Sequence, residues 1–355
     1  MGGESYKGWI IALFTLSAGL SRPFSGKLAD KIGRIPVMIF GAGVCFVVGL
    51  SYPLLHFVSG FLFLRFAHGF SAGFTPTGTS AYVADTVPFA QRGEALGTQS
   101  LFGSLGMAAG PALGGWIASI WPLNVLFYAS AFTAIFSILI LLRLKETLPK
   151  KEPFRLRLFK LDKNEILEKR VLLPSSILFL SVFSFGVVLT LIPDLSSFLG
   201  IKNKGLFFAV FTLSSLGIRL IAGRASDRIG RVKVMRVASV VMVLAMIAVA
   251  FATSKEMLLG SAVLFGAAVG MYSPTTTAWV VDRSLENFRG RALATMYIFL
   301  ELGIGLGALV SSWLYNNKPE NFQIAFLFSA GIAFLGFLIL MFIKSDRKIS
   351  TDFVS

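Results

Sequence analysis

The chain has 355 residues, of which 55% are hydrophobic and only 14% are charged. This composition is too apolar for an ordinary soluble domain, and it indicates a chain that lies in lipid. The formal net charge of +15 would suggest nucleic acid binding in a soluble protein. Here the basic residues fall mainly between apolar stretches, so we expect no nucleic acid partner.

Apolar stretches recur along the whole chain, each close to the roughly 20 residues that a helix needs to cross the hydrocarbon. The pattern predicts an all-α polytopic membrane protein with eleven spanning helices. We expect the spans, in chain order, at 8–25, 36–55, 58–83, 95–119, 124–143, 172–195, 205–222, 233–252, 256–281, 291–315 and 321–343.

The Lys and Arg residues are concentrated on one side of these spans. They follow the first, third, fifth, seventh and ninth spans and include Lys344, Arg347 and Lys348 in the tail. The positive-inside rule makes this side cytoplasmic. We therefore expect a multi-pass protein of the cell membrane with a cytoplasmic C-terminus and an extracytoplasmic N-terminus.

The chain has one cysteine, Cys45, and two histidines. A single cysteine inside a predicted span excludes a disulfide framework, and so few thiol and imidazole groups argue against a zinc site. We expect neither a metal nor a cofactor. Residues 1–7 lack the charged start of a cleavable signal peptide, so the first apolar stretch is interpreted as a span.

An internal repeat organises the chain. Residues 7–38 align without a gap with residues 204–235, an offset of 197, and the same offset pairs Asp85 with Asp282. Duplicated halves are typical of secondary transporters, which bind their substrate between the repeats near the bilayer midplane. We expect an N-terminal bundle at 1–143, a linker at 144–171, a C-terminal bundle at 172–344 and a cytoplasmic tail at 345–355.

The repeat also predicts a helix that the sequence lacks. The span at 172–195 should have a partner 197 residues earlier, which falls before Met1. We therefore expect a twelve-helix plan of which eleven helices are present. The basic linker is interpreted as a topology signal and tether, although a polybasic segment can also bind anionic lipid.

A short motif occurs twice, as Gly-Lys-Leu-Ala-Asp-Lys-Ile-Gly-Arg at 26–34 and Gly-Arg-Ala-Ser-Asp-Arg-Ile-Gly-Arg at 223–231. It resembles the signature loop of the major facilitator superfamily, and this resemblance implies a loop that locks a cytoplasmic gate. Ile35 and Val232 depart from the last basic position of that pattern. The motif positions assigned to the gate are Gly26, Asp30, Gly33, Arg34, Gly223, Asp227, Gly230 and Arg231.

Asp85 and Asp282 lie at the ends of their predicted helices, where the negative end of the helix dipole disfavours an acid. We expect cationic partners for them, either Arg92 and Arg289 or the motif residues Arg34 and Arg231. Such pairs would extend the gate as a charge network. A solvated surface acid is the alternative for either one.

Residues 61–69 resemble another motif of the same family, with Arg65 at its arginine and His68 where glutamine is usual. A charge within the bilayer costs at least about 2.5–3.5 kcal/mol, so Arg65 should face a cavity or an acid. Ser71 and Thr75 continue its helix face. We expect a polar substrate cavity lined by Arg65, His68, Ser71, Thr75, Ser104 and Glu301.

Residues 103–115 are similar to a glycine-rich motif of the family's drug:proton antiporters. Pro111 removes a backbone hydrogen bond and bends a helix, and glycines allow helices to pack closely. The resemblance implies export. The helix-bending residues are Gly106, Gly110, Pro111, Gly114 and Gly115, and close packing alone is the alternative explanation.

Glu301 lies in the middle of a predicted span, at the repeat position of Ser104. A carboxylate there is costly when ionised, so it can carry a proton at one stage of a cycle. Glu301 is our first candidate for proton coupling and Asp194 the second. We expect Glu301 to release its proton when water or Arg65 approaches it. Pairing of Glu301 with a hydroxyl is the structural alternative.

The preferred hypothesis is a monomeric secondary transporter that exchanges protons for a small, amphipathic or drug-like molecule by alternating access. Its partners are then the solute, protons and membrane lipid. A proton symporter that imports a sugar, organic acid or peptide keeps the same fold. A membrane enzyme lacks support, because no catalytic motif is recognisable, and an inactive truncated protein is a further alternative.

Overall fold

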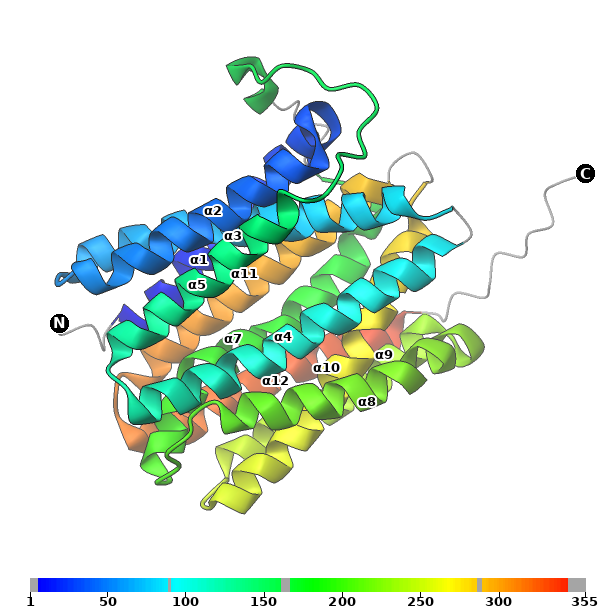
Figure 1. Cartoon of the computed structure of the whole chain (residues 1–355). Helices are drawn as coiled ribbons and strands as arrows, with labels where there is room; N and C mark the ends of the chain where they lie inside the picture. The colour runs from blue at the N-terminus through cyan, green and yellow to red at the C-terminus, as the bar shows by residue number, and fades with distance from the viewer. Residues whose placement is uncertain (1–5, 89–90, 161–166, 286–288, 344–355) are drawn as a thin grey trace, which may run out of the picture.

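The computed structural model describes residues 6–88, 91–160, 167–285 and 289–343, and within these ranges it is helical with no strand. Figure 1 shows long helices packed side by side, with the linker looping over one end of the molecule. The long helices are α1 (Lys7–Ile32), α2 (Arg34–Ser51), α3 (Val58–Thr86), α4 (Arg92–Ile120), α5 (Leu123–Leu141), α7 (Leu172–Phe198), α8 (Leu206–Ile229), α9 (Arg231–Ala250), α10 (Lys255–Arg283), α11 (Arg289–Tyr315) and α12 (Phe322–Phe342). Short 3₁₀ turns are η2 (Tyr52–Leu54), η4 (Leu156–Phe159), η5 (Lys169–Val171) and η7 (Pro319–Asn321).

Each predicted span corresponds to one of these helices, but the two signature motifs are not loops. Helix α1 continues through Asp30 to Ile32, and α8 continues through Asp227 to Ile229. Only Gly33 and Gly230 interrupt the helices, with φ of +121° and +98°. Side chains other than glycine rarely adopt such φ values, so these two glycines fix the turns into α2 and α9.

Eight described helices are long and apolar enough to cross a membrane, or nine if the two segments of α8 count as one span. Helix α8 bends by 44° between Leu206–Arg219 and Ile221–Ile229. Helices α1 and α3 fall short by composition, because Gly, Ser and Thr replace apolar residues and each helix carries an arginine within its length. Such helices suit a protein interior better than a lipid-facing position.

Glycines bring α1 against α3 and, in the second repeat, α8 against α10. A Cβ added to Gly69 would collide with the carbonyl of Phe14, and a Cβ on Gly266 would collide with the carbonyl of Phe211. The two contacts are related by the offset of 197. Close backbone approach of this kind is the usual role of small residues between membrane helices.

Side-chain contacts repeat at the same offset. Ser17 donates to the carbonyl of Phe66 at 2.5 Å, and Ser214 donates to that of Val263 at 2.7 Å. Thr79 donates to the sulfur of Met38 at 3.4 Å, and Thr276 donates to that of Met235 at 3.5 Å. The two halves therefore share a packing scheme as well as a sequence pattern. These pairs lie wholly within helices α1–α5 or wholly within α7–α12.

In the described part of the chain, two helix pairs make most of the contact between the halves. Helix α1 packs along α11, where Gly8 lies against Ala308, and α4 packs along α8, where Pro111 lies against Gly205. The linker packs against one end of α1, where the N–H of Glu152 donates to the carbonyl of Lys31 at 2.8 Å. It is thus attached to α1 rather than extending freely into solvent.

The halves are unequally packed. The main buried core joins α7 to α12 and includes Phe207, Phe265, Met242, Trp279 and Phe326. The corresponding cluster among the N-terminal helices is small, and most of α4 is exposed. In the described part of the chain nothing lies within 4 Å of a Cβ added at Gly103, Gly106 or Gly110. By contrast, the repeat partners of Gly106 and Gly110, Gly303 and Gly307, pack against α7.

The contact between α8 and α10 can be tested with alanine at Gly266. Because the new Cβ would meet the Phe211 carbonyl and the Ser214 Cβ, the helices must separate. We expect the free energy of unfolding to fall by about 1–3 kcal/mol. Thermal unfolding of the purified protein in detergent measures the change.

Gly260 on the same helix provides the matched control, because nothing lies within 4 Å of its Cβ position among the described residues. Alanine there should leave stability unchanged or raise it by up to about 1 kcal/mol through helix propensity. Equal destabilisation by both substitutions would contradict the close-packing argument.

Candidate functional site

A buried ion pair joins the two halves. Arg22 of α1 donates from Nη2 to Oε1 of Glu301 on α11 at 3.0 Å, and the two side chains are only 9% and 8% exposed. The Cβ of Glu301 lies next to Gly19, one turn before Arg22. The carboxylate chosen from the sequence therefore has a charged partner, and that partner is Arg22 rather than Arg65.

The surroundings of Arg22 hold its guanidinium in place. The Tyr297 ring lies 4.3 Å from Arg22 Cζ in a cation–π contact. Arg22 Nε is buried and has no hydrogen-bond partner among the described residues. An arginine does not lose its proton in a protein, so burial is tolerated here because Glu301 balances the charge. In the sequence, the repeat pairs Arg22 with Arg219, and the available signal for a role was a charge inside an apolar stretch.

A hollow of about 110 Å³ lies beside this ion pair, between α1 and α11. Its walls are apolar apart from Thr15 and Glu301. They consist of Trp9, Ala12, Leu13, Thr15, Leu16, Glu301, Leu302, Gly305, Leu306 and Leu309.

The predicted cavity residues of α3 lie away from Glu301. Arg65 Nε donates to the carbonyl of Ile10 at 2.9 Å, and its guanidinium lies 4.6 Å from the Phe14 ring centre. Ile10 and Arg22 are twelve residues apart on α1, or about 18 Å along a helix. The structure therefore does not bring Arg65 to Glu301.

The other residues on this face of α3 make local contacts. His68 Nδ1 lies 3.1 Å from the hydroxyl of Tyr52, and Ser71 donates back to the His68 carbonyl at 2.7 Å. Thr75 accepts at its carbonyl from Thr79. His68 thus faces the end of α2 and η2, and this polar face lies within the N-terminal helices.

A second arginine occupies the repeat position of Arg22. Arg219 of α8 donates from Nη1 to the hydroxyl of Ser104 on α4 at 3.1 Å. Ser104 is the repeat partner of Glu301, so both halves place an arginine against the same position of the opposite half. The carboxylate is present at only one of these contacts.

A second ion pair between the halves lies at the opposite end of α1 from its signature motif. Lys7 donates to Asp194 near the end of α7, and the Lys7 ammonium lies 5.9 Å from the Tyr315 ring centre. Asp194, the second candidate for proton coupling, is therefore paired with a lysine. Its side chain is 23% exposed, so it is less buried than Glu301.

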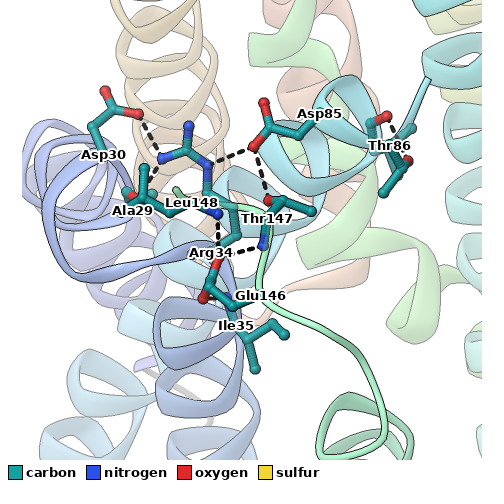
Figure 2. Close-up of polar contacts among 10 residues, drawn as sticks. Ala29, Asp30, Arg34, Ile35, Asp85, Thr86, Glu146, Thr147 and Leu148 are labelled. Atoms are coloured by element: carbon teal, nitrogen blue, oxygen red, sulfur yellow. Dashed lines mark hydrogen bonds and ion pairs between the residues drawn. The ribbon is translucent and has the colours of Figure 1, made fainter. Parts of the chain in front are cut away.

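Both signature motifs form the same cluster of charges. Arg34 contacts Asp30 at 2.9 Å and Asp85 at 3.1 Å, as Figure 2 shows. In the second copy Arg231 contacts Asp227 at 2.5 Å and Asp282 at 2.9 Å. The arginine therefore links the end of the preceding helix to α3 or α10. The side chains of Arg92 and Arg289, the alternative partners, lie outside the described part of the structure.

The first cluster includes a residue that sequence analysis missed. The carboxylate of Glu146, just after α5, accepts from the backbone N–H groups of Arg34 and Ile35 at 3.0 and 3.1 Å (Figure 2). It also accepts from Thr147 and Leu148, while the Thr147 hydroxyl donates to Asp85 at 2.9 Å. Glu146 thus caps the beginning of α2, where N–H groups otherwise lack partners.

These hydrogen bonds alter the acidity of Glu146. Partial burial disfavours its charged form, but the four backbone N–H donors outweigh that effect and lower its pKa from the ordinary value of 4.5. The cap is therefore fully charged near neutral pH. The signal in the sequence was an acid three residues after the end of a predicted span.

The remaining motif glycines show two kinds of surroundings. A Cβ at Gly26 or Gly223 would meet nothing within 4 Å among the described residues. Gly115, at the end of the helix-bending motif, packs against Asn203 and Gly205. Gly114 lies close to Leu126, whose Cδ1 would be only 3.3 Å from an added Cβ, which is tighter than an ordinary van der Waals contact. Pro111 lies inside α4 without ending it.

The Glu146 cap predicts a pH-dependent contribution to stability. Glutamine at this position keeps one acceptor oxygen but loses the charge, which should lower the free energy of unfolding by about 1 kcal/mol near neutral pH. Because the folded-state pKa is lowered, the wild-type advantage should be complete above about pH 4.5 and vanish as pH falls through the folded-state value.

Unfolding midpoints of wild type and Glu146→Gln, measured from pH 7 downward, test this cap. Glu320→Gln on exposed η7 is the control for removing a carboxylate, and it should change stability little at any pH. A Glu146→Gln deficit that stays constant down to the lowest pH would contradict the assignment.

Comparison with known proteins identifies the family. The sequence profile of the Major Facilitator Superfamily matches residues 2–218 and 175–352. Multidrug resistance protein MdtG of Klebsiella pneumoniae is 28% identical over 337 residues, covering 92% of this chain and 81% of MdtG. The multi-drug resistance efflux pump PmrA of Streptococcus pneumoniae is 30% identical over 327 residues, covering 86% of this chain and 78% of PmrA.

Solved structures share the fold. The human organic anion transporter MFSD10 superposes with a TM-score of 0.71 at 22% identity, covering 94% of this chain and 83% of that one. A D-xylose-proton symporter gives a TM-score of 0.77 at 18% identity, covering 95% and 87%. With its profile match, its duplicated signature motif and its paired helical halves, the chain belongs to the Major Facilitator Superfamily.

Proposed function

We propose that this protein is a secondary active transporter that exports a small, drug-like molecule in exchange for protons by alternating access. The observation that carries the proposal is the buried carboxylate of Glu301, paired with Arg22 at the contact between the two halves. The efflux function stated in the name of PmrA supports the direction, and the name of MdtG states multidrug resistance. No catalysis and no cofactor enter the proposal.

The Arg22–Glu301 pair couples a proton to helix movement. While Glu301 is ionised, the pair holds α1 against α11 and both charges are balanced. A proton on Glu301 removes one charge, so the attraction across the interface is lost and the helices can separate. The carboxyl group then returns its proton when the other side of the interface opens. Arg22 remains charged throughout.

The membrane position and sidedness follow from the distribution of basic residues. In this proposal the signature motifs and the linker face the cytoplasm, and the end with Lys7 and Asp194 faces outward. The bundles are residues 1–143 and 172–344, joined by the linker at 144–171, and the tail at 345–355 is cytoplasmic. A monomer in lipid is sufficient, because both halves of the transport path lie in one chain.

The charged clusters of the signature motifs are proposed to act as the cytoplasmic gate. The arginine of each cluster connects two helices through two carboxylates, so its contacts must change if these helix ends separate. At the outer end, Lys7 and Asp194 join α1 to α7 and therefore one half to the other, whereas each motif cluster lies within one half. Breaking one set of contacts while keeping the other is the requirement of alternating access.

The open glycines of α4, Gly103, Gly106 and Gly110, support the expected twelve-helix plan. Gly303 and Gly307 of α11 pack on α7, whereas their repeat partners Gly106 and Gly110 are open in the described structure. We propose that a helix equivalent to α7 covers α4 in the working transporter. A bend at Pro111 then allows α4 to rock between that helix and α8.

Replacing Glu301 with glutamine tests the proton step. Glutamine keeps the shape but cannot take up or release a proton, so transport driven by a pH gradient should be abolished while solute binding stays measurable. Dye transport is followed in proteoliposomes with an imposed pH gradient. Asp194→Asn is the comparison. Because Asp194 is proposed as an outer contact and not as the proton carrier, this variant should change the rate of transport but keep its dependence on the pH gradient.

Several results would contradict this proposal. Full proton-coupled flux in Glu301→Gln would remove Glu301 from the mechanism. Accumulation in right-side-out rather than inverted vesicles would show import and favour the symporter. Absence of any flux by the wild-type chain, with or without an added first helix, would favour an inactive truncated protein.

The gate predicts a kinetic effect of Asp30→Asn. Loss of the contact to Arg34 should slow turnover by up to about fivefold, the range expected for an exposed ion pair, without lowering the amount of protein in the membrane. Asp227→Asn makes the equivalent change in the second copy. Initial rates at saturating solute, normalised to protein, measure both, and unchanged rates in the two variants would count against the gate.

A further inference from the structure

Arg219 marks a place where the two repeats differ in charge. It occupies the repeat position of Arg22, and its neighbour Ser104 occupies that of Glu301. Both arginines reach from one half of the molecule to the other, with contacts of 3.0 Å to Glu301 and 3.1 Å to Ser104. One arginine therefore meets a carboxylate and the other a neutral hydroxyl.

The charge of Arg219 is left unbalanced. The guanidinium group stays protonated in proteins. Among the described residues no carboxylate lies within ion-pair distance of it, and its Nε is buried without a hydrogen-bond partner. Ser104 occupies only Nη1. A planar guanidinium with open donors is the group that proteins use to bind a carboxylate through two parallel hydrogen bonds.

We propose that Arg219 binds a carboxylate group carried by the transported solute. This inference rests on the proposed function and specifies the chemical class of the substrate. In the first contact the protein supplies the carboxylate itself, through Glu301. In the second contact Ser104 has no carboxylate, so the ligand supplies it. The bound ligand then lies between α8 of one half and α4 of the other.

The position of Arg219 suits such a role. Helix α8 bends by 44° directly after this residue, between Leu206–Arg219 and Ile221–Ile229. A ligand held by Arg219 therefore contacts α8 at the point where its two segments meet. The arrangement favours acidic and zwitterionic molecules over purely cationic ones, because the two central arginines are balanced by one glutamate.

Rhodamine 110 and rhodamine 123 provide a matched pair of probes, because rhodamine 123 is the methyl ester of rhodamine 110. Fluorescence polarisation measures their equilibrium binding to the purified full chain in neutral detergent, and it needs no proton gradient. We expect wild type to bind the acid at least about tenfold more tightly than the ester, as charge-assisted hydrogen bonds require.

Three variants separate this subsite from a structural role. Arg219→Gln should remove the preference for the acid. Ser104→Glu should also remove it, because a built-in carboxylate would occupy Arg219 as Glu301 occupies Arg22. Ser104→Ala, the control at the same position, should retain the preference. All three should bind the ester within about twofold of wild type.

Equal wild-type affinity for the two dyes, or no binding of the acid, would overturn the proposal. A preference for the acid that survives in Ser104→Glu would overturn it as well. Proton-driven flux of the two dyes in proteoliposomes is measured separately. A protein that binds the acid through Arg219 but moves neither dye would contradict the proposed transport function and leave the carboxylate subsite standing.

Discussion

The central constraint on this molecule is the cost of holding charge between helices in a lipid environment. Arg22 stays protonated, so its buried charge needs a carboxylate partner. That partner is Glu301, which lies on a helix of the other half. Holding Arg22 and Glu301 together therefore also holds α1 against α11. Separation of these helices would leave two exposed charges, unless a proton or water compensates them. This requirement connects the protonation of one side chain to the relative position of two bundles.

The two repeats share one scheme of helix packing, and the positions where they differ carry the charges that the proposed function uses. Glycine contacts, serine-to-carbonyl bonds and threonine-to-methionine contacts recur at the same offset in both halves. At the interface the symmetry ends, because Glu301 faces Arg22 while Ser104 faces Arg219. In the proposed mechanism, one of these two equivalent positions takes up protons and the other binds a ligand.

The signature motifs illustrate how one local conformation serves several contacts. A single glycine with positive φ turns the chain between two helices and places an arginine at the beginning of the second. That arginine then reaches back to an aspartate one turn earlier and across to another helix. In the first copy Glu146 adds a cap on α2, so the chain that follows α5 is tied to the same cluster. The first charged cluster, which is the proposed gate in the N-terminal half, is therefore directly connected to the linker.

Much of the architecture was already visible in the sequence. Spans of apolar residues report a lipid environment because hydrocarbon thickness sets their length, and a repeat at constant offset reports a duplicated fold because both copies must pack alike. The sequence offered the motif arginines Arg34 and Arg231 as one of two possible sets of partners for Asp85 and Asp282. It could do so because the motif places an arginine at the same helix end as each aspartate. Spacing along one helix likewise placed Arg65 and His68 on one face.

Contacts between distant segments could not be obtained in this way. Arg22 and Glu301 meet because α1 and α11 pack at a particular rotation and height, and side-chain spacing determines relative positions only within one helix. For the same reason Arg65 was expected near Glu301 but lies against Ile10. Glu146 became a cap only when the chain after α5 returned to α2. Composition and periodicity thus established the lipid-embedded, duplicated helical fold, while the pairing of buried charges arose from the packing of helices far apart in the chain.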